Sequence, residues 1–265
     1  MDTSKQLSHK ETALITGASS GIGADIAREL AALGYDLVLT ARRTDRLEAL
    51  KSELEKGGAT RVQILSEDLA APGGAASLIR RVGELGTPIS FLVNNAGFGL
   101  HGDFLGHDQA RLDQMLQLNM ATLTTLTWHF GREMKKRGRG RIMQLSSIGA
   151  FQPSPYYSAY SATKVYVLYL SEAVNYELRG SGVSVTTVCP GLTATEFHDV
   201  AEHPKTGLAA LTLMQSRPVA RMAVAATLRG RAVLTPGILN KLTAFFVKLM
   251  PRSWVTAVGG IMMKD

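Results

Sequence analysis

The segment TALITGASSGIG, residues 12–23, decides the fold of this 265-residue chain. It joins a short apolar run, Thr12 to Thr16, to three closely spaced glycines. A helical pattern through Ile26 and Leu30 follows and ends at Gly34. A strand, a glycine turn and a helix in this order predict the first unit of a parallel α/β sheet.

The glycines of this segment, Gly17, Gly21 and Gly23, suit a nucleotide-binding turn. Because glycine has no side chain, the backbone can turn sharply and approach a pyrophosphate at the positive N-terminus of the following helix. The spacing is Gly-x-x-x-Gly-x-Gly rather than Gly-x-Gly-x-x-Gly, and a glycine motif alone is weak evidence. Its place between a predicted strand and a predicted helix indicates dinucleotide binding.

The second predicted strand, residues 35–40, ends at Ala41-Arg42-Arg43. In a dinucleotide-binding unit, an acidic residue at this strand end selects a free 2′-hydroxyl, whereas arginine accommodates a 2′-phosphate. Ala41 stands where the acid would be, and the guanidinium groups of Arg42 and Arg43 suit a phosphate. We therefore expect NADP(H) to be preferred over NAD(H). The alternative is that both arginines only solvate the loop.

Strands and helices alternate along the rest of the chain. Strands are predicted at 61–66, 89–93, 141–145, 183–188 and 231–235, and helices at 45–56, 74–85, 108–136, 156–179 and 219–228. This alternation indicates βαβ units with right-handed crossovers. The sequence has no internal repeat, low-complexity run or long linker, so we predict one domain over residues 1–265.

The composition, with 45% hydrophobic and 19% charged residues, is that of an ordinary globular protein. A single cysteine, Cys189, excludes an intramolecular disulfide, and the scattered histidines have no zinc-type spacing, so no metal is expected. The net charge is +7, but the basic cluster at 132–141 has no interleaved aromatic residues, so nucleic-acid binding is not expected. Residues 1–11 are polar and no apolar run reaches about 18 residues, so we expect a cytoplasmic location.

The run YYSAYSATK, residues 156–164, is the candidate for the chemistry. Of its three tyrosines only Tyr160 has a lysine four residues later, and positions i and i+4 share one face of a helix. A cation near a phenol favours the phenolate, so we expect Lys164 to lower the pKa of Tyr160. Tyr-x-x-x-Lys also occurs on ordinary helices, so the pair needs support from the rest of the chain.

Two polar residues provide such support. Ser147 follows the predicted strand 141–145, and ligands of open α/β sheets collect beyond the carboxyl ends of the strands. Asn119 lies within the apolar stripe of the long helix 108–136. A buried asparagine must satisfy its polar groups, so Asn119 is either a structural bridge or part of a site.

Together these motifs resemble those of the short-chain dehydrogenase/reductase family. The matches, which span residues 12–195 in the family's order, are Thr16-Gly17-x-x-x-Gly21-x-Gly23, Asp68-Leu69, Asn94-Asn95-Ala96-Gly97, Asn119, Ser147, Tyr160-x-x-x-Lys164 and Pro190-Gly191. The resemblance implies a doubly wound Rossmann domain of the α/β class. Its seven-stranded parallel sheet, in the order 3-2-1-4-5-6-7, is flanked by helices, and the chain adds a C-terminal helical extension.

The resemblance also implies the catalytic roles. Tyr160 gives a proton to a substrate carbonyl or takes one from an alcohol, and Ser147, rather than the adjacent Ser146, hydrogen-bonds the same oxygen. Lys164 lowers the tyrosine pKa and binds the nicotinamide ribose, and Asn119 supports a water-mediated proton relay to Lys164. The implied cofactor-binding residues are Gly17, Ser19, Ser20, Gly21, Ile22, Gly23, Arg42, Arg43, Asp68, Leu69, Asn95, Ala96, Gly97, Tyr160, Lys164, Pro190, Gly191, Leu192 and Thr195.

The chain departs from many NADP-preferring members at one position. Those members carry a basic residue just before the second motif glycine, where this chain has Ser20. The expected preference for NADP(H) therefore depends on Arg42, Arg43 and the missing acid.

The family's variable substrate lid corresponds to about 196–217. The expected pocket residues are Phe98, Ile148, Phe151, Tyr157 and Phe197. An apolar wall suits a small, lipophilic carbonyl or alcohol substrate, although many of these side chains could instead pack the lid onto the core.

The C-terminal extension, about 237–265, carries an apolar stripe that includes Leu239, Leu242 and Phe245. We expect this stripe to pack on its own domain or on a partner subunit. Peripheral contact with an anionic membrane is the less favoured alternative. The resemblance implies a homodimer or homotetramer. A non-catalytic NADP(H)-binding sensor or scaffold with the same fold remains the rival to an oxidoreductase.

Overall fold

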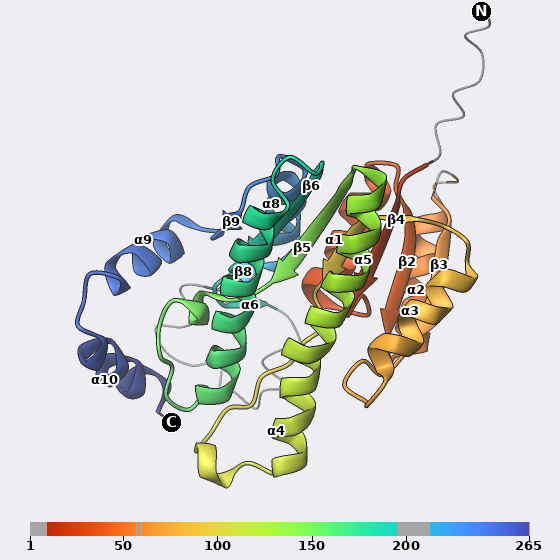
Figure 1. Ribbon diagram of the computed structural model, residues 1–265. Coiled ribbons are helices and arrows are strands. Elements are labelled where there is room, and N and C mark those ends of the chain that lie inside the picture. The colour runs from red at the N-terminus through yellow and green to blue at the C-terminus, as the bar shows by residue number, and fades with distance from the viewer. Residues whose placement is uncertain (1–9, 57, 59, 195–212, 265) are drawn as a thin grey trace, which may run out of the picture.

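Seven parallel strands form the centre of the protein in the order β3-β2-β1-β4-β5-β6-β9 (Figure 1). They are β1 (Thr12–Thr16), β2 (Asp36–Ala41), β3 (Val62–Ser66), β4 (Ile89–Asn94), β5 (Gly140–Leu145), β6 (Val183–Val188) and β9 (Val233–Leu234). The structure, a computed structural model, describes residues 10–56, 58, 60–194 and 213–264. The predicted order is confirmed, with β9 as the seventh strand of the sheet.

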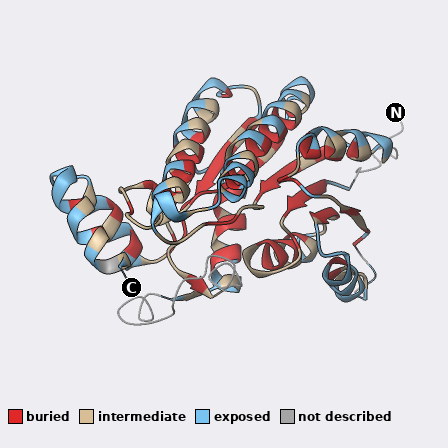
Figure 2. Cartoon of the chain, turned by 90° about the horizontal axis from the view of Figure 1, so that it is seen from below, coloured by how far each residue is buried: buried red, intermediate tan, exposed pale blue. Residues whose placement is uncertain are grey.

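Helices cover both faces of this sheet, since neighbouring strand residues point to opposite faces. In β1, Ala13 and Ile15 pack with α1 (Gly21–Ala32), α2 (Thr44–Glu55) and α8 (Ser216–Leu228), whereas Leu14 packs on the other face. The helices of that face are α3 (Gly74–Glu84), α5 (Leu123–Arg137) and α6 (Ser158–Glu177). Figure 2 shows the buried sheet between helices whose outer sides are exposed. This arrangement confirms the Rossmann-like α/β class.

The strand order reverses between β1 and β4, and Thr16 joins the ends of these two strands. Its Oγ1 donates to the carbonyl of Val93 at 3.1 Å and accepts from the N–H groups of Asn95 and Ala96 at 3.0 Å each. Ligands of doubly wound sheets bind at such a switch point.

The predicted helix at 108–136 is divided in the structure. It consists of α4 (Gln109–Leu116), a π-helical turn η2 (Gln117–Thr122) and α5. A π turn adds one residue per turn and is frequent at functional sites. A sequence pattern with near-helical spacing does not reveal this extra residue.

Two short strands outside the main sheet were not predicted from the sequence. β7 (Thr193–Ala194) pairs in parallel with β8 (Met214–Gln215). Most of the predicted lid, about 196–217, lies outside the described residues, so its expected role stays a prediction.

Two helices follow β9: α9 (Ile238–Val247) and α10 (Arg252–Met263). They form the predicted C-terminal extension and lie beside α6 at the outer edge of the molecule (Figure 1). Leu239, Leu242 and Phe245 are exposed, so the apolar stripe is not covered by its own domain. Packing on a partner subunit, the other part of the expectation, stays a prediction.

Among the described residues, no helix is long and apolar enough to cross a membrane.

Candidate active site

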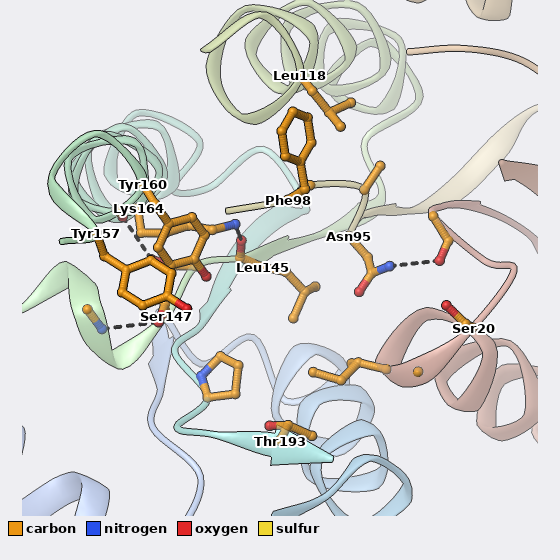
Figure 3. Close-up of a pocket in the computed structure, with 18 of the residues that line it drawn as sticks. Ser20, Asn95, Phe98, Leu118, Leu145, Ser147, Tyr157, Tyr160, Lys164 and Thr193 are labelled. Carbon is orange, nitrogen blue, oxygen red and sulfur yellow. Dashed lines mark hydrogen bonds between the residues drawn. The ribbon is translucent and has the colours of Figure 1, made fainter. Parts of the chain in front are cut away.

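A cleft of about 450 Å³ opens at the carboxyl ends of the central strands. Figure 3 shows Ser20 and Asn95 towards one end of it, and Ser147, Tyr157 and Tyr160 towards the other. The cleft thus brings together segments that follow β1, β4, β5 and β6.

The glycine turn between β1 and α1 is fixed by close contacts that only glycine allows. Gly17 has a φ of +65°, and a Cβ atom there would lie 2.9 Å from the Cα atom of Ala96. A Cβ atom on Gly23 would lie 2.4 Å from the carbonyl oxygen of Gly17. The side-chain Nδ2 of Asn95 donates to the carbonyls of Thr16 and Gly17 at 3.0 Å each. Asn95 therefore holds the turn in place.

The first turn of α1 is available to an anion. The helix begins at Gly21, and the side chain of its N-cap residue, Ser20, makes no capping hydrogen bond. The early N–H groups of a helix lack acceptors within the helix and carry a partial positive charge. This helix end therefore suits a phosphate group.

Arg43 lies over the same turn although it follows β2. Its Nη2 donates to Ser20 Oγ at 2.9 Å and to Ser19 Oγ at 3.2 Å. A guanidinium group therefore lies beside Ser20, the position at which the turn itself has no basic residue. Arg42 also lines the cleft.

The opposite end of the cleft holds Tyr160 and Lys164 of α6 with Ser147. Ser147 and Tyr160 line this end together, and Ser147 Oγ accepts from the N–H of Gly149 at 3.1 Å. Lys164 Nζ donates to the carbonyl of Leu145 at 2.9 Å and lies 5.5 Å from the centre of the Tyr160 ring. The helical spacing therefore does place both side chains in one site.

Desolvation dominates the pKa values of this pair. It raises the pKa of Tyr160 to about 12, and the hydrogen bond with Ser147 only partly opposes this rise. It also lowers the pKa of Lys164 to about 8. The expectation that Lys164 lowers the pKa of Tyr160 is therefore wrong for this structure. The physical reason is that both groups are removed from water and the ammonium group donates to Leu145.

Asn119 lies on the π turn η2, just below the cleft. Its Oδ1 accepts from the N–H of Phe98 at 3.2 Å, and its Nδ2 donates to the carbonyl of Phe98 at 2.9 Å and to Thr163 Oγ1 at 3.1 Å. Asn119 is thus a bridge between the segment after β4 and the helix that carries Tyr160. A Cβ atom on Gly97 would lie 2.9 Å from Asn119 Oδ1 and 3.6 Å from Lys164 Nζ, so Gly97 permits this packing.

Most of the predicted site residues meet in this one cleft. Its walls include Gly17, Ser19, Ser20, Gly21, Ile22, Arg42, Arg43, Asp68, Leu69, Asn95, Ala96, Gly97, Phe98, Ser147, Ile148, Tyr157, Tyr160, Lys164, Pro190, Gly191 and Leu192. Gly23 and Asn119 support the walls from beneath. Thr195 and Phe197 lie outside the described residues.

Phe151 is the predicted pocket residue that the structure places elsewhere. It lines a separate groove between α6 and the C-terminal extension, where Lys248 Nζ lies 5.6 Å from the centre of its ring. The short 3-10 helix η3 (Ile148–Ala150) turns the chain after Ser147, so Ile148 faces the cleft and Phe151 does not.

Met263 is the wall residue farthest along the chain among those that sequence reasoning missed; others are Leu118, Gln152 and Thr193. It belongs to α10, more than 100 positions after Ser147, yet it lines the same cleft. Its carbonyl lies 3.1 Å from His101 Nε2, and the His101 ring lies 5.0 Å from the ring of Tyr157. No sequence signal shows where a C-terminal helix docks. The glycine pair at 259–260, unusual within a helix, was the one available hint of close packing.

A sheet with this switch point, a glycine cradle after β1 and a Ser–Tyr–Lys group after β5 defines a dinucleotide-dependent oxidoreductase. The family model described as short chain dehydrogenase matches residues 11–205, and the chain belongs to this family.

The proteins similar to this chain carry names that indicate different substrates. Sulfoacetaldehyde reductase of Chromohalobacter salexigens is 36% identical over 185 residues, which cover 69% of this chain and 72% of that protein. A short-chain dehydrogenase of Sphingobium yanoikuyae, solved in complex with NADPH, is 33% identical with a TM-score of 0.81 over 96% of each chain. A bulky-bulky ketone specific alcohol dehydrogenase of Comamonas testosteroni is 31% identical, with a TM-score of 0.76 over 91% of this chain and 93% of that chain.

The cleft fits a nicotinamide dinucleotide. The glycine cradle leaves room for a pyrophosphate at the start of α1, and Lys164 lines the other end of the same cleft. The chain is therefore a nicotinamide-dependent oxidoreductase.

Proposed function

We propose that the protein is an NADP(H)-dependent reductase or dehydrogenase of a carbonyl and its alcohol. The observation that carries this proposal is that the Ser147 and Tyr160 hydroxyls line the same end of the cleft, with Lys164 Nζ 5.5 Å from the centre of the Tyr160 ring. Two hydroxyls that converge on one point can both bind a single substrate oxygen. The glycine cradle lies at the other end of the same cleft.

At this oxygen, Tyr160 transfers the proton and Ser147 stabilises the developing charge. During reduction, Tyr160 gives its phenolic proton to the carbonyl oxygen and Ser147 donates a hydrogen bond to it as negative charge develops. With a pKa of about 12, Tyr160 is protonated at neutral pH and ready for this step. During oxidation the proton returns to Tyr160. The nicotinamide, when bound, supplies or accepts the hydride.

Lys164 and Asn119 complete the site. With a pKa of about 8, the Lys164 ammonium can exchange a proton near neutral pH. Asn119 keeps the Phe98 segment and the start of α6 in register, which positions Lys164. The proposed water relay to Lys164 would begin beside this bridge.

A preference for NADP(H) is supported by the charge around the adenosine end. Ala41 offers no carboxylate, and Arg42 and Arg43 line the cleft there. Arg43 is already directed to the phosphate-binding turn by Ser19 and Ser20. Guanidinium groups pair with phosphate oxygens through two parallel hydrogen bonds.

A lipophilic substrate is supported by the walls around Tyr160. Phe98, Leu118, Ile148, Tyr157 and Met263 line this part of the cleft. Such a wall favours a carbonyl that carries apolar groups over a small charged aldehyde.

We further propose that the whole chain acts as one domain, because Met263 of α10 and Gly17 after β1 line the same cleft. A homodimer or homotetramer is supported by exposed aromatic side chains on the long helices, namely Trp128 of α5 and Tyr169 and Tyr176 of α6.

Kinetics of the Tyr160→Phe variant test the proposal. Turnover of a panel of aldehydes and ketones, followed by NADPH absorbance, should fall at least about a hundredfold, which is the usual contribution of a general acid. NADPH binding, followed by fluorescence, should change little. A Tyr156→Phe variant serves as the matched control and should keep its activity, because Tyr156 is not among the residues that line the cleft.

Two outcomes would contradict this function. Near-normal rates of Tyr160→Phe would remove Tyr160 from the mechanism. NADPH binding by the wild-type protein without turnover on broad panels in both directions would favour the rival sensor or scaffold.

A further inference from the structure

The apolar face of α9 is largely exposed, and its Phe245 also lines the groove beside α6. Its large side chains at i, i+1, i+4, i+7 and i+8 are all exposed, and the stripe continues one residue past the C-cap; the members are Ile238, Leu239, Leu242, Phe245, Phe246 and Leu249. Ile238 is 78% exposed, whereas the inward-facing Asn240 and Ala244 are 7% exposed. A surface helix normally buries its large apolar stripe. In α9 the large apolar side chains face solvent, and small or polar side chains face the protein.

The inward face of α9 is fixed, so the stripe cannot turn towards the core. Asn240 Nδ2 donates to the carbonyl of Pro236 at 2.8 Å. A Cβ atom on Gly191 would lie 2.5 Å from Asn240 Nδ2, so the helix packs tightly on the loop after β6.

The next helix, α10, has the same polarity. Trp254, Val258 and Ile261, at i, i+4 and i+7, are exposed. The opposite face holds the buried Val255 and Gly259, and a Cβ atom on Gly259 would lie 3.4 Å from the carbonyl oxygen of Pro153. Two consecutive helices therefore each present an exposed apolar face. We call the nine large exposed apolar side chains of α9 and α10 named above the outer stripe.

Cations predominate around the outer stripe. Residues 236–265 contain Lys241, Lys248, Arg252 and Lys264 and a single acidic residue, Asp265. Lys241 and Arg252 are exposed, and among the ion pairs of the described residues none involves either of them. Exposed cations beside apolar and aromatic groups match the headgroups and acyl chains of an anionic bilayer.

A second copy of the chain fits this surface less well. A two-fold contact between outer stripes would bring the four cations of both copies together with Asp265 as the single acidic residue of the extension in each copy. We propose that α9 and α10 lie along the surface of an anionic lipid bilayer, with the outer stripe in the boundary between headgroups and acyl chains. This contact does not depend on the proposed catalytic function.

Vesicle sedimentation of the full-length protein tests this proposal. Vesicles of phosphatidylglycerol should carry down the wild-type protein, and vesicles of phosphatidylcholine should carry down much less. An Ile238→Ser/Phe245→Ser/Trp254→Ser variant should lose at least about tenfold in partition, because each buried methylene contributes to interfacial binding. A Lys241→Gln/Arg252→Gln variant should lose about fivefold per removed cation. A Leu33→Ser/Leu105→Ser variant, which removes exposed apolar side chains of other regions, should partition like wild type.

Circular dichroism and thermal melting confirm that each variant is folded, and light scattering without lipid gives its oligomeric state. Equal recovery of wild-type protein with both kinds of vesicle would overturn the proposal, as would unchanged partition of the triple variant. A triple variant that dissociates a larger wild-type assembly in the absence of lipid would show that a second copy covers the outer stripe instead.

Discussion

Burial of the Lys164 side chain costs free energy when the protein folds, because its ammonium group leaves water. In the described part of the structure, the ammonium group contacts the Leu145 carbonyl and the Tyr160 ring instead. Its pKa in the folded protein, about 8, lies below the ordinary value of 10.5. Between these two pH values the unfolded chain binds more protons at this residue than the folded chain does. Stability therefore rises with pH across this window through Lys164.

We expect a Lys164→Met variant to lack this rise. Between pH 8 and 10 the free energy of unfolding of wild type should increase relative to the variant by about 1–3 kcal/mol. Urea titrations at several pH values measure this difference. A Lys56→Met variant, which removes an exposed lysine after α2, serves as the control and should follow wild type. Parallel pH profiles for wild type and Lys164→Met would show that the buried ammonium group does not titrate in this range.

Arg43 should decide the choice of cofactor. Loss of a hydrogen bond to a charged group costs about 1.5–3 kcal/mol, so Arg43→Ala should raise the Michaelis constant for NADPH roughly tenfold or more and leave that for NADH nearly unchanged. Arg42→Asp should also relieve discrimination against NADH, since it adds the carboxylate that Ala41 does not supply. Steady-state kinetics with both cofactors measure these effects, with Arg80→Ala on α3 as the control. Unchanged cofactor ratios in both variants would remove the basis for the NADP(H) assignment.

For single residues, the sequence predicted which side chains line the cleft better than it predicted how far each of them is removed from water. Tyr160, Ser147 and Lys164 were found from spacing and order, and the cleft contains all three. The direction of the Tyr160 pKa was not found, because it depends on how deeply the side chain is desolvated. Desolvation is a property of the packed protein and leaves no local pattern in the sequence.

The turn between β1 and α1 depends closely on glycine, because a side chain on Gly17 or Gly23 would collide with the neighbouring backbone. The carbonyl of Gly17, the amide of Asn95 and the position of Gly23 share one small volume. Sequence reasoning located this turn because strand, glycines and helix are local features. It could not show that Asn95, after β4, holds the turn closed.

Gly23→Ala should therefore weaken both folding and cofactor binding. The added methyl group would meet the Gly17 carbonyl oxygen, and overpacking of this kind typically costs about 1–3 kcal/mol. Urea unfolding and NADPH fluorescence titration would record both effects. Gly83→Ala is the matched control, since nothing lies within 4 Å of its added Cβ and alanine is favoured in α3 by up to about 1 kcal/mol. If Gly23→Ala is as stable as wild type and binds NADPH as well, the turn tolerates more movement than its contacts indicate.

At the scale of the molecule, the order of the sheet was predictable and the docking of the last two helices was not. Alternating strands and helices with right-handed crossovers leave few topologies, and the family resemblance selected one of them. α9 and α10 come after the last strand, so no such rule constrains them. The apolar stripe of this extension was expected to pack on its own domain or on a partner subunit, whereas tight contacts at Gly191 and Pro153 turn the opposite faces of α9 and α10 towards the domain.

The docking of α10 predicts that substrate size is selected from the C-terminal end of the chain. Met263→Trp should lower kcat/KM for bulky ketones about tenfold, because it reduces the space beside Tyr157, and it should affect small aldehydes less. Affinity for NADPH should stay the same. Ile261→Ala, on the exposed side of the same helix, is the control. Equal effects of Met263→Trp on large and small substrates would place Met263 outside the substrate region.

The hydrogen bonds of Thr16 have a further consequence for how the cleft can open. Because they join the ends of β1 and β4, the two halves of the sheet cannot part at the switch point without breaking three contacts. The wall formed by α10 is attached outside the sheet, through His101, the buried Val255 and the close approach of Gly259 to Pro153. Substrate exchange should therefore proceed by movement of the C-terminal wall while the cofactor side stays still. An enzyme divided in this way can acquire a new substrate through changes in its last two helices and keep its nucleotide site intact.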